Sequence, residues 1–222
     1  MGYFDRSVKE FYWRQNGKKF DNNSRQGDNP ALQISPTDNG LVSIIYVSKP
    51  SIIKYKDFSK FQNFVMEKHS PNVVEIHKNL DFPLENFSEI YTRYSKALVG
   101  VGTSKGFDTE NNLELELVAL ENPYTDNMAD GIEILALYNG NPRALSNLNV
   151  FERSNTDSSV NTFVVKTNDK GVAVVEVKND CTYLIDNVII RPANKKLFKD
   201  RGVIWESLWA ALTFSVIRSN GI

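Results

Sequence analysis

Apolar residues alternate with polar or small residues along most of the second half of the chain. The last such run has four apolar residues at a spacing of two: Ala210, Leu212, Phe214 and Val216. This period puts the four side chains on one face of a half-buried β-strand. Trp205 and Trp209 precede them, and large aromatic side chains generally bury in a core. We therefore expect residues 204–216 to form a strand that closes a hydrophobic core.

Six further segments of the second half have the character of strands. They cover residues 113–120, 131–138, 148–153, 160–166, 172–177 and 183–191. Clusters of Asn, Asp, Gly and Pro, such as Asn139-Gly140-Asn141-Pro142, separate these segments and are typical of turns. Seven short strands in roughly a hundred residues, with turns every 8–12 residues, are typical of an immunoglobulin-like β-sandwich.

Two segments of the first half have the apolar spacing of amphipathic helices. The first follows Asp57, which can cap it, and Pro71 interrupts it. Its apolar residues are Phe58, Phe61, Phe64 and Val65. The second segment contains Phe87, Ile90, Tyr91 and Tyr94, and it runs into an extended stretch over residues 96–102.

The rest of the first half predicts strands and a domain boundary. Residues 41–47 (LVSIIYV) predict a strand, and Phe11-Tyr12-Trp13 a shorter one. The polar, glycine-containing segment 103–112 is typical of a connector between domains. We therefore expect a mainly β protein: an α+β N-terminal domain with one or two short helices over residues 1–108, and the immunoglobulin-like or transthyretin-like sandwich over residues 109–222.

Composition excludes several function classes. The 222 residues include 26 Lys and Arg and 27 Asp and Glu, so a net charge of −1 gives no case for nucleic acid or an anionic membrane as partner. The single cysteine, Cys181, excludes an internal disulfide and predicts a buried, inert thiol. The first residues lack the regions of a secretory signal, and no apolar run approaches the roughly 18 residues of a transmembrane helix.

No catalytic motif stands out. The chain lacks a nucleophile elbow, a phosphate loop and a dinucleotide fingerprint. Glu114 and Glu116 share one face of a predicted strand, which we expect to be solvated. Trp205 and Trp209 could form a sugar platform, although a buried aromatic cluster is the favoured interpretation. A carbohydrate hydrolase needs two carboxylates roughly 5–10 Å apart across a cleft, and the pattern identifies no such pair.

The two histidines are the candidates for metal ligands. His69 and His77 lie in one short region with Glu67, Glu75 and Asp81. Imidazole combined with carboxylate suits zinc, nickel or cobalt. The hypothesis is that His69 and His77 coordinate a divalent ion, with Glu67 or Asp81 supplying oxygen. Their spacing matches no compact ligand signature, and the favoured alternative is that both are surface or structural histidines.

An ordered set of short motifs runs through most of the chain. They are YTRYSKAL at 91–98, LENPY at 120–124, LYNGNPR at 137–143, FER at 151–153, TNDKG at 167–171, YLID at 183–186 and WESLWAALTF at 205–214. Together they resemble the bacterial domain-of-unknown-function family labelled as the nickel-uptake substrate-specific region. The resemblance implies a C-terminal sandwich akin to transthyretin-like and carboxypeptidase-regulatory modules. It also implies a periplasmic protein associated with the uptake of nickel, cobalt or related metals.

The resemblance also bears on the start of the chain and on its role. Family members typically begin with a signal peptide and a mature start containing His-Glu-Phe-Trp, so the resemblance implies that this chain starts inside the family's N-terminal domain. His69 and His77 lie where relatives often carry histidines. We thus expect a non-enzymatic accessory protein for divalent metal uptake that binds nickel, cobalt or zinc. The alternative is an adaptor that binds an envelope transport component without metal.

Overall fold

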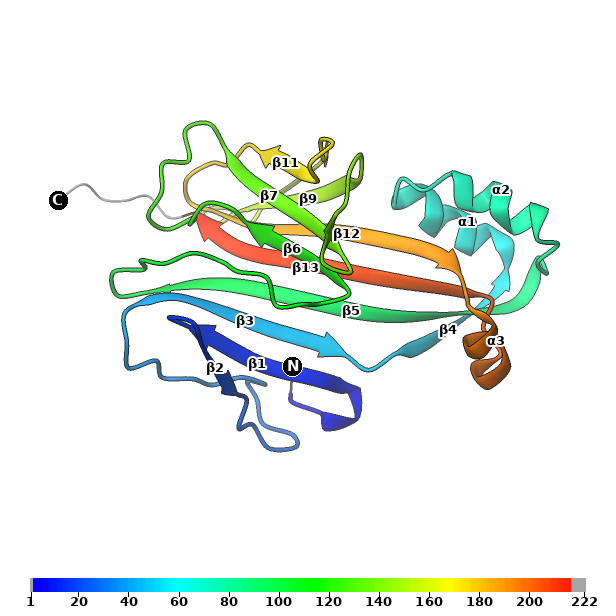
Figure 1. Ribbon diagram of the computed structural model, residues 1–222, viewed down its shortest axis with the longest axis horizontal. Helices are drawn as coiled ribbons and strands as arrows, with labels where there is room; N and C mark the ends of the chain where they lie inside the picture. Colours follow the sequence, from blue (N-terminus) through cyan, green and yellow to red (C-terminus); the bar gives the residue numbers. More distant parts are fainter. Residues whose placement is uncertain (1, 217–222) are drawn as a thin grey trace. The chain divides into compact units, whose positions relative to one another are not determined.

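The computed structural model describes residues 2–216 of the chain (Figure 1). Its strands are β1 (Val8–Gln15), β2 (Lys18–Asp21), β3 (Gly40–Ser48), β4 (Ser51–Asp57), β5 (Glu85–Val101), β6 (Leu115–Ala119), β7 (Ile132–Tyr138), β8 (Asn141–Pro142), β9 (Asn147–Ser154), β10 (Val160–Lys166), β11 (Val172–Val175), β12 (Cys181–Pro192) and β13 (Trp205–Val216). Its helices are the 3₁₀ turn η1 (Asp5–Ser7), α1 (Phe58–Glu67), α2 (Asn72–Asn79) and α3 (Lys195–Arg201). The protein is mainly β, as the sequence predicts.

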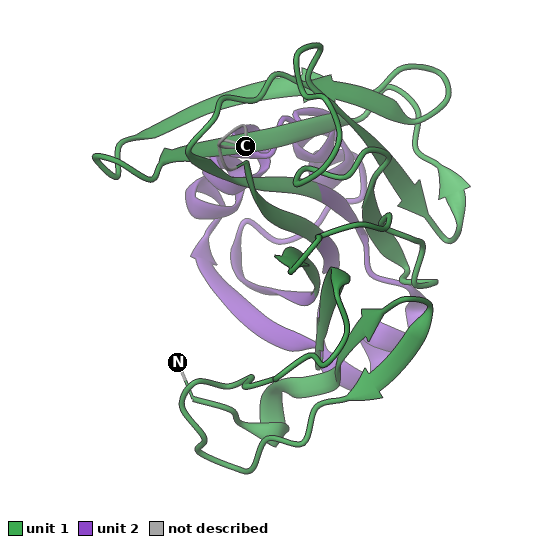
Figure 2. Cartoon of the chain, turned by 90° about the vertical axis from the view of Figure 1, so that its left-hand side faces the viewer, with its two compact units in different colours: residues 1–49, 94–187, 210–222 green, residues 50–93, 188–209 purple. Residues whose placement is uncertain are grey.

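The chain forms two compact units, coloured separately in Figure 2. Unit 1 comprises Met1–Lys49, Tyr94–Asn187 and Ala210–Ile222, and unit 2 comprises Pro50–Arg93 and Val188–Trp209. The expected division between residues 108 and 109 falls inside unit 1. The reason is that the long strands β5, β12 and β13 each contribute residues to both units, so each unit combines segments distant in sequence.

Unit 1 is the β-sandwich. Among the described residues, one sheet has nine strands in the order β10-β9-β12-β13-β5-β3-β1-β2, and its ninth strand, β4 of unit 2, pairs with the unit 2 part of β5. A second sheet has the order β11-β7-β6, with β8 on β7. Figure 1 shows β1, β3, β5 and β13 running side by side in the larger sheet. Both sheets bury aliphatic side chains completely, for example Leu115 and Ile134 in the smaller sheet and Ile45 and Ile185 in the larger one. This burial makes the core of the sandwich.

Unit 2 packs helices against strands around an aromatic core. Its fully packed residues are Tyr55, Phe61, Val65, Val73, Phe87, Ile204 and Trp205. The α1 helix begins where Asp57 accepts a hydrogen bond from the backbone N–H of Lys60, 3.3 Å away, as an N-cap does. Within residues 2–216, no helix is both long and apolar enough to cross a membrane.

Most predicted elements are confirmed. The last strand spans Trp205–Val216, and the side chains of Ala210, Leu212, Phe214 and Val216 are all buried on one face. The predicted strand at 41–47 is β3, and the helix capped by Asp57 is α1. Cys181 is free and buried, and burial raises the pKa of its thiol, which suits an inert residue.

The predicted second helix is wrong. The segment with Phe87, Ile90, Tyr91 and Tyr94 belongs to β5, a strand of 17 residues, because it pairs with β4 over residues 85–91 and with β3 over residues 94–101. Aromatic and β-branched residues fit such a strand better than a helix, and their spacing of three and four is coincidental. The second helix is instead α2, which begins just after Pro71.

Candidate functional site

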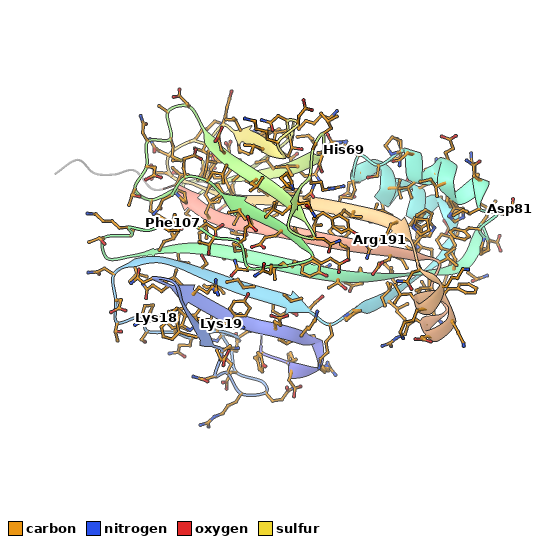
Figure 3. All side chains as sticks on the ribbon, in the orientation of Figure 1. Lys18, Lys19, His69, Asp81, Phe107 and Arg191 are labelled. Carbon is orange, nitrogen blue, oxygen red and sulfur yellow. The ribbon has the colours of Figure 1, made fainter. Side chains whose placement is uncertain are left out.

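The four predicted metal ligands lie at separate places in unit 2. Glu67 ends α1, and His69 follows it on an exposed turn with a positive φ of 53°. Asp81 is also exposed and follows α2. Figure 3 shows His69 and Asp81 at the two ends of the helical pair. The intervening helix has eight residues and, at 1.5 Å per residue, is about 12 Å long, whereas metal ligands lie near 2 Å from the ion.

His77 is a structural residue. Its side chain is fully buried, and its Nδ1 accepts a hydrogen bond from the indole Nε1 of Trp205 at 3.0 Å. Its Nε2 lies 3.2 Å from the carbonyl oxygen of Pro83, to which it donates. Both ring nitrogens are therefore engaged, and burial lowers the pKa of the imidazole, which favours the neutral form.

Aromatic rings surround His77 on several sides. Phe58, Phe61, Phe82 and Phe87 have ring centroids 4.5 to 5.8 Å from that of the imidazole, and Trp205 stacks at 6.0 Å. Such a cage excludes water and gives a metal ion no open coordination position. The residues described by the structure contain no group of three or more His, Cys, Asp or Glu side chains that could hold a metal ion. The proposed four-residue site is thus not assembled, and metal binding stays a prediction.

The two C-terminal tryptophans belong to the same aromatic core. Trp205 is fully buried against Phe61, with ring centroids 5.2 Å apart, so it is closed to a sugar. Trp209 is half-buried and stacks on Phe64 at 5.4 Å with an interplanar angle of 13°. The favoured interpretation of a buried cluster is therefore confirmed.

Unit 2 also contains a buried carboxyl group that the sequence pattern does not predict. Glu89 is only 2% exposed and accepts hydrogen bonds from the hydroxyls of Tyr55, at 2.7 Å, and Ser207. Trp209 donates to Ser207 at 2.9 Å and extends the chain of hydrogen bonds. No ion pair in the described part of the chain involves Glu89, and burial raises its pKa. The alternation of side chains places Glu89 on a buried face only if this segment is a strand, whereas its apolar spacing predicts a helix.

A second buried polar cluster lies in unit 1. Lys96 on β5 contacts Asp108 at 3.1 Å and Glu116 at 2.9 Å. The three side chains are 2%, 0% and 2% exposed, so the expectation that Glu116 lies on a solvated face is wrong. The face carrying Glu116 is buried because the loop before β6 folds over it, and Asn111 and Leu113 of that loop donate backbone hydrogen bonds to its carboxylate. These two carboxylates share one ammonium and are closed to a substrate, unlike a glycosidase pair.

The two ends of the larger sheet differ in how they are protected. At one end, β2 has four residues, of which Lys18, Lys19 and Asp21 are charged (Figure 3). Short, charged edges resist pairing with other chains. At the other end, β10 has seven residues and pairs only with β9 among the described strands. Its interior carries no charge, and Val160 and Val164 are 58% and 44% exposed.

The backbone of β10 presents hydrogen-bonding groups to its open side. The register pairs Val160 with Arg153 and Lys166 with Asn147. The N–H of Ser154 donates to the carbonyl of Ser159 at 2.9 Å, and that of Thr167 to Ser146 at 2.9 Å, which fixes the alternation of an antiparallel pair. The backbone N–H and C=O groups of Asn161, Phe163 and Val165 therefore point towards β9. The outward N–H and C=O groups belong to Val160, Thr162, Val164 and Lys166.

Comparisons with known proteins give a family and no further relative. A family model described as a domain of unknown function, DUF4198, matches residues 3–190. No curated protein and no solved structure matches the chain.

Proposed function

The chain belongs to the DUF4198 family of domains of unknown function, and we propose that it is a non-enzymatic binding module whose β10 strand pairs with a strand of a partner protein. The observation that carries this proposal is the open edge of β10, seven residues long and free of charge in its interior. Strand addition at such an edge is a recurrent mode of peptide recognition, in which main-chain hydrogen bonds provide affinity.

The side chains of β10 support the same role. Val160, Thr162, Val164 and Lys166 have both their side chains exposed and their peptide groups directed to the open side. Exposed apolar edges are an aggregation hazard that proteins usually remove with charges, proline or a bulge. The only charge on β10 is Lys166, at its end. An edge left unprotected in its middle is explained by a partner strand that covers it.

The proposal is non-catalytic because the buried histidine and the buried carboxylate pair, within the described residues, are closed to a substrate. The ring nitrogens of His77 are hydrogen-bonded, and the paired carboxylates of Asp108 and Glu116 are buried against Lys96. The location outside the cytoplasm is part of the proposal and rests on the family resemblance. A metal-uptake role also rests on that resemblance alone.

Site-specific photo-cross-linking in the native host tests the proposal. A photoreactive residue in place of Val164 lies next to any strand added to β10, since paired strands lie about 4.8 Å apart. We expect one protein to be cross-linked from position 164, and none from a matched probe in place of Lys19 on β2. Cross-linking of the same protein from both positions, or of none from position 164, contradicts the proposal.

A proline variant separates strand pairing from simple proximity. Thr162→Pro removes an outward N–H and leaves the bonds of Phe163 and Asn161 to β9 in place, as edge strands tolerate. In the background of the probe at position 164, we expect Thr162→Pro to abolish the cross-link and Thr162→Val to preserve it. A cross-link that survives Thr162→Pro overturns strand addition.

A further inference from the structure

The buried cluster of Lys96, Asp108 and Glu116 in unit 1 has the composition of a self-modifying site. The Nζ of Lys96 lies 3.1 Å from Oδ2 of Asp108 and 2.9 Å from Oε1 of Glu116, and it also donates to the carbonyl of Thr109 at 3.1 Å. All three side chains are at least 98% buried. An amine and a carboxyl group are therefore held together where bulk water does not reach.

We propose that Lys96 and Asp108 join through an intramolecular amide bond, with Glu116 as the group that accepts a proton from the amine. Such a bond would tie β5 to the loop that precedes β6, across residues 96 to 108. It is independent of the strand pairing proposed for β10.

The charge balance of the cluster favours the reactive protonation state. Two carboxylates and one ammonium carry a net charge of −1, and an uncompensated buried charge is costly. Uptake of one proton makes the cluster neutral. Burial raises the pKa of Asp108 in spite of the nearby lysine, which identifies Asp108 as the carboxyl group that takes this proton. Glu116 accepts hydrogen bonds from the backbone and side-chain N–H groups of Asn111 and from the backbone N–H of Leu113, which hold its carboxylate beside the amine.

Donors on both oxygens of Asp108 prepare its carbonyl carbon for attack. Oδ1 accepts from the backbone N–H of Thr109 at 2.9 Å and from the Ser43 hydroxyl at 3.4 Å. Oδ2 accepts from the backbone N–H of Ala119 at 3.1 Å. Fixed donors at these positions stabilise the negative charge that develops on oxygen in the tetrahedral intermediate.

The condensation balances without an oxidant or a second reactant. One of the three Nζ protons passes to Glu116, and the free amine attacks Cγ of Asp108. A second Nζ proton leaves with the Asp108 hydroxyl as water, so a C–N bond forms, a C–O bond breaks and one proton remains on the amide nitrogen. Well-oriented groups react with effective molarities of about 10⁵–10⁸ M, which offsets the ordinary preference for hydrolysis.

Mass spectrometry of the intact, denatured chain tests the bond. We expect a mass lower than the sequence mass by one water molecule, and a protease digest in which Lys96 and Asp108 are joined in one branched peptide. An unchanged mass overturns the proposal. Loss of water that maps elsewhere, for example to a succinimide at Asp130-Gly131, overturns it as well.

Two variants identify the chemistry. Glu116→Gln retains the size of the side chain and removes the proton acceptor, so we expect a folded chain with the full sequence mass. Lys96→Arg retains the positive charge and cannot form the same amide, and it serves as the reference for an intact ion pair. Folding of both is checked by circular dichroism. Loss of water that persists in Lys96→Arg contradicts the assignment.

Discussion

The indole Nε1 of Trp205 donates a hydrogen bond to Nδ1 of His77 across 3.0 Å, and the other imidazole nitrogen donates to the carbonyl of Pro83. The donor on Trp205 fixes the tautomer of His77 with its proton on Nε2, since Nδ1 must accept. A neutral histidine is thereby built into the aromatic core of unit 2. Trp205 and His77 therefore have a structural role, although the sequence predicts His77 as a metal ligand.

Removing the indole donor should destabilise unit 2. Trp205→Phe leaves Nδ1 of His77 without a partner, and an unsatisfied buried acceptor costs about 1–3 kcal/mol before any loss of packing is counted. Urea unfolding followed by circular dichroism measures the change. Phe198→Ala, at a side chain that is 60% exposed on α3, is the matched control and should change stability by less than about 0.5 kcal/mol. Equal effects of the two variants contradict this role for Trp205.

Stability should fall as pH drops below the usual pKa of histidine. Burial lowers the pKa of His77 in the folded state, so the unfolded chain binds the proton first. The stabilisation is therefore complete above about pH 6.5, the unfolded value, and is lost as pH falls from there through the folded pKa. Unfolding free energies at several pH values in this range should show the decline for the wild type and for His69→Gln. Because Glu89 titrates in the same unit, the pH profile of the wild type is compared with that of His77→Gln. The variant should lack the part of the decline that comes from His77. Identical profiles contradict the assignment.

Glu89 should contribute a pH dependence of folding stability with the opposite sign to that of His77. Burial raises its folded pKa, so its contribution favours folding below the unfolded value of about 4.5 and is lost as pH rises through the folded pKa. At pH 8 we expect Glu89→Gln to be at least as stable as the wild type, because the amide can hydrogen-bond Tyr55 and Ser207 without a buried charge. Glu89→Ala should be destabilised, since it leaves both hydroxyls without their acceptor. Thermal unfolding at pH 8 measures both, and a Glu89→Gln variant as unstable as Glu89→Ala contradicts this prediction.

Much of the fold is predictable from the sequence because apolar and polar residues alternate regularly along the strands. The alternation in 204–216 and in the six segments before it predicts strands that the structure contains, because one face of each strand must bury. The prediction of a helix over residues 87–94 is wrong because a strand with aromatic residues on both faces can have the same spacing as a helix. Its burial depends on β4 and β3, which pair with it from a distant part of the sequence.

The candidate site was less predictable. His69 and His77 are eight residues apart, and only the tertiary structure shows that one lies on an exposed turn and the other among five aromatic rings. The burial of Glu116 depends on the loop over residues 108–113, whose path no periodicity encodes. The open edge of β10 is likewise a property of strand order, which local patterns do not determine.

Metal titration tests the hypothesis drawn from the family resemblance. With nickel, cobalt or zinc added to the purified chain, that hypothesis predicts a one-to-one complex in native mass spectrometry that is lost in His69→Ala. No complex, or a complex that His69→Ala leaves unchanged, contradicts a site built on His69. His69→Ala suits this test because the side chain is exposed and its removal leaves the core intact.

The most direct test of the central claim is the affinity of the partner cross-linked at β10 for three forms of the purified chain. Isothermal titration calorimetry would compare the wild type, Thr162→Val and Thr162→Pro. We predict that Thr162→Val binds like the wild type and that Thr162→Pro binds at least about tenfold more weakly, a difference of roughly 1.4 kcal/mol that matches the loss of a main-chain hydrogen bond and its strand geometry. Equal affinity of all three forms would show that the partner does not pair with the edge of β10.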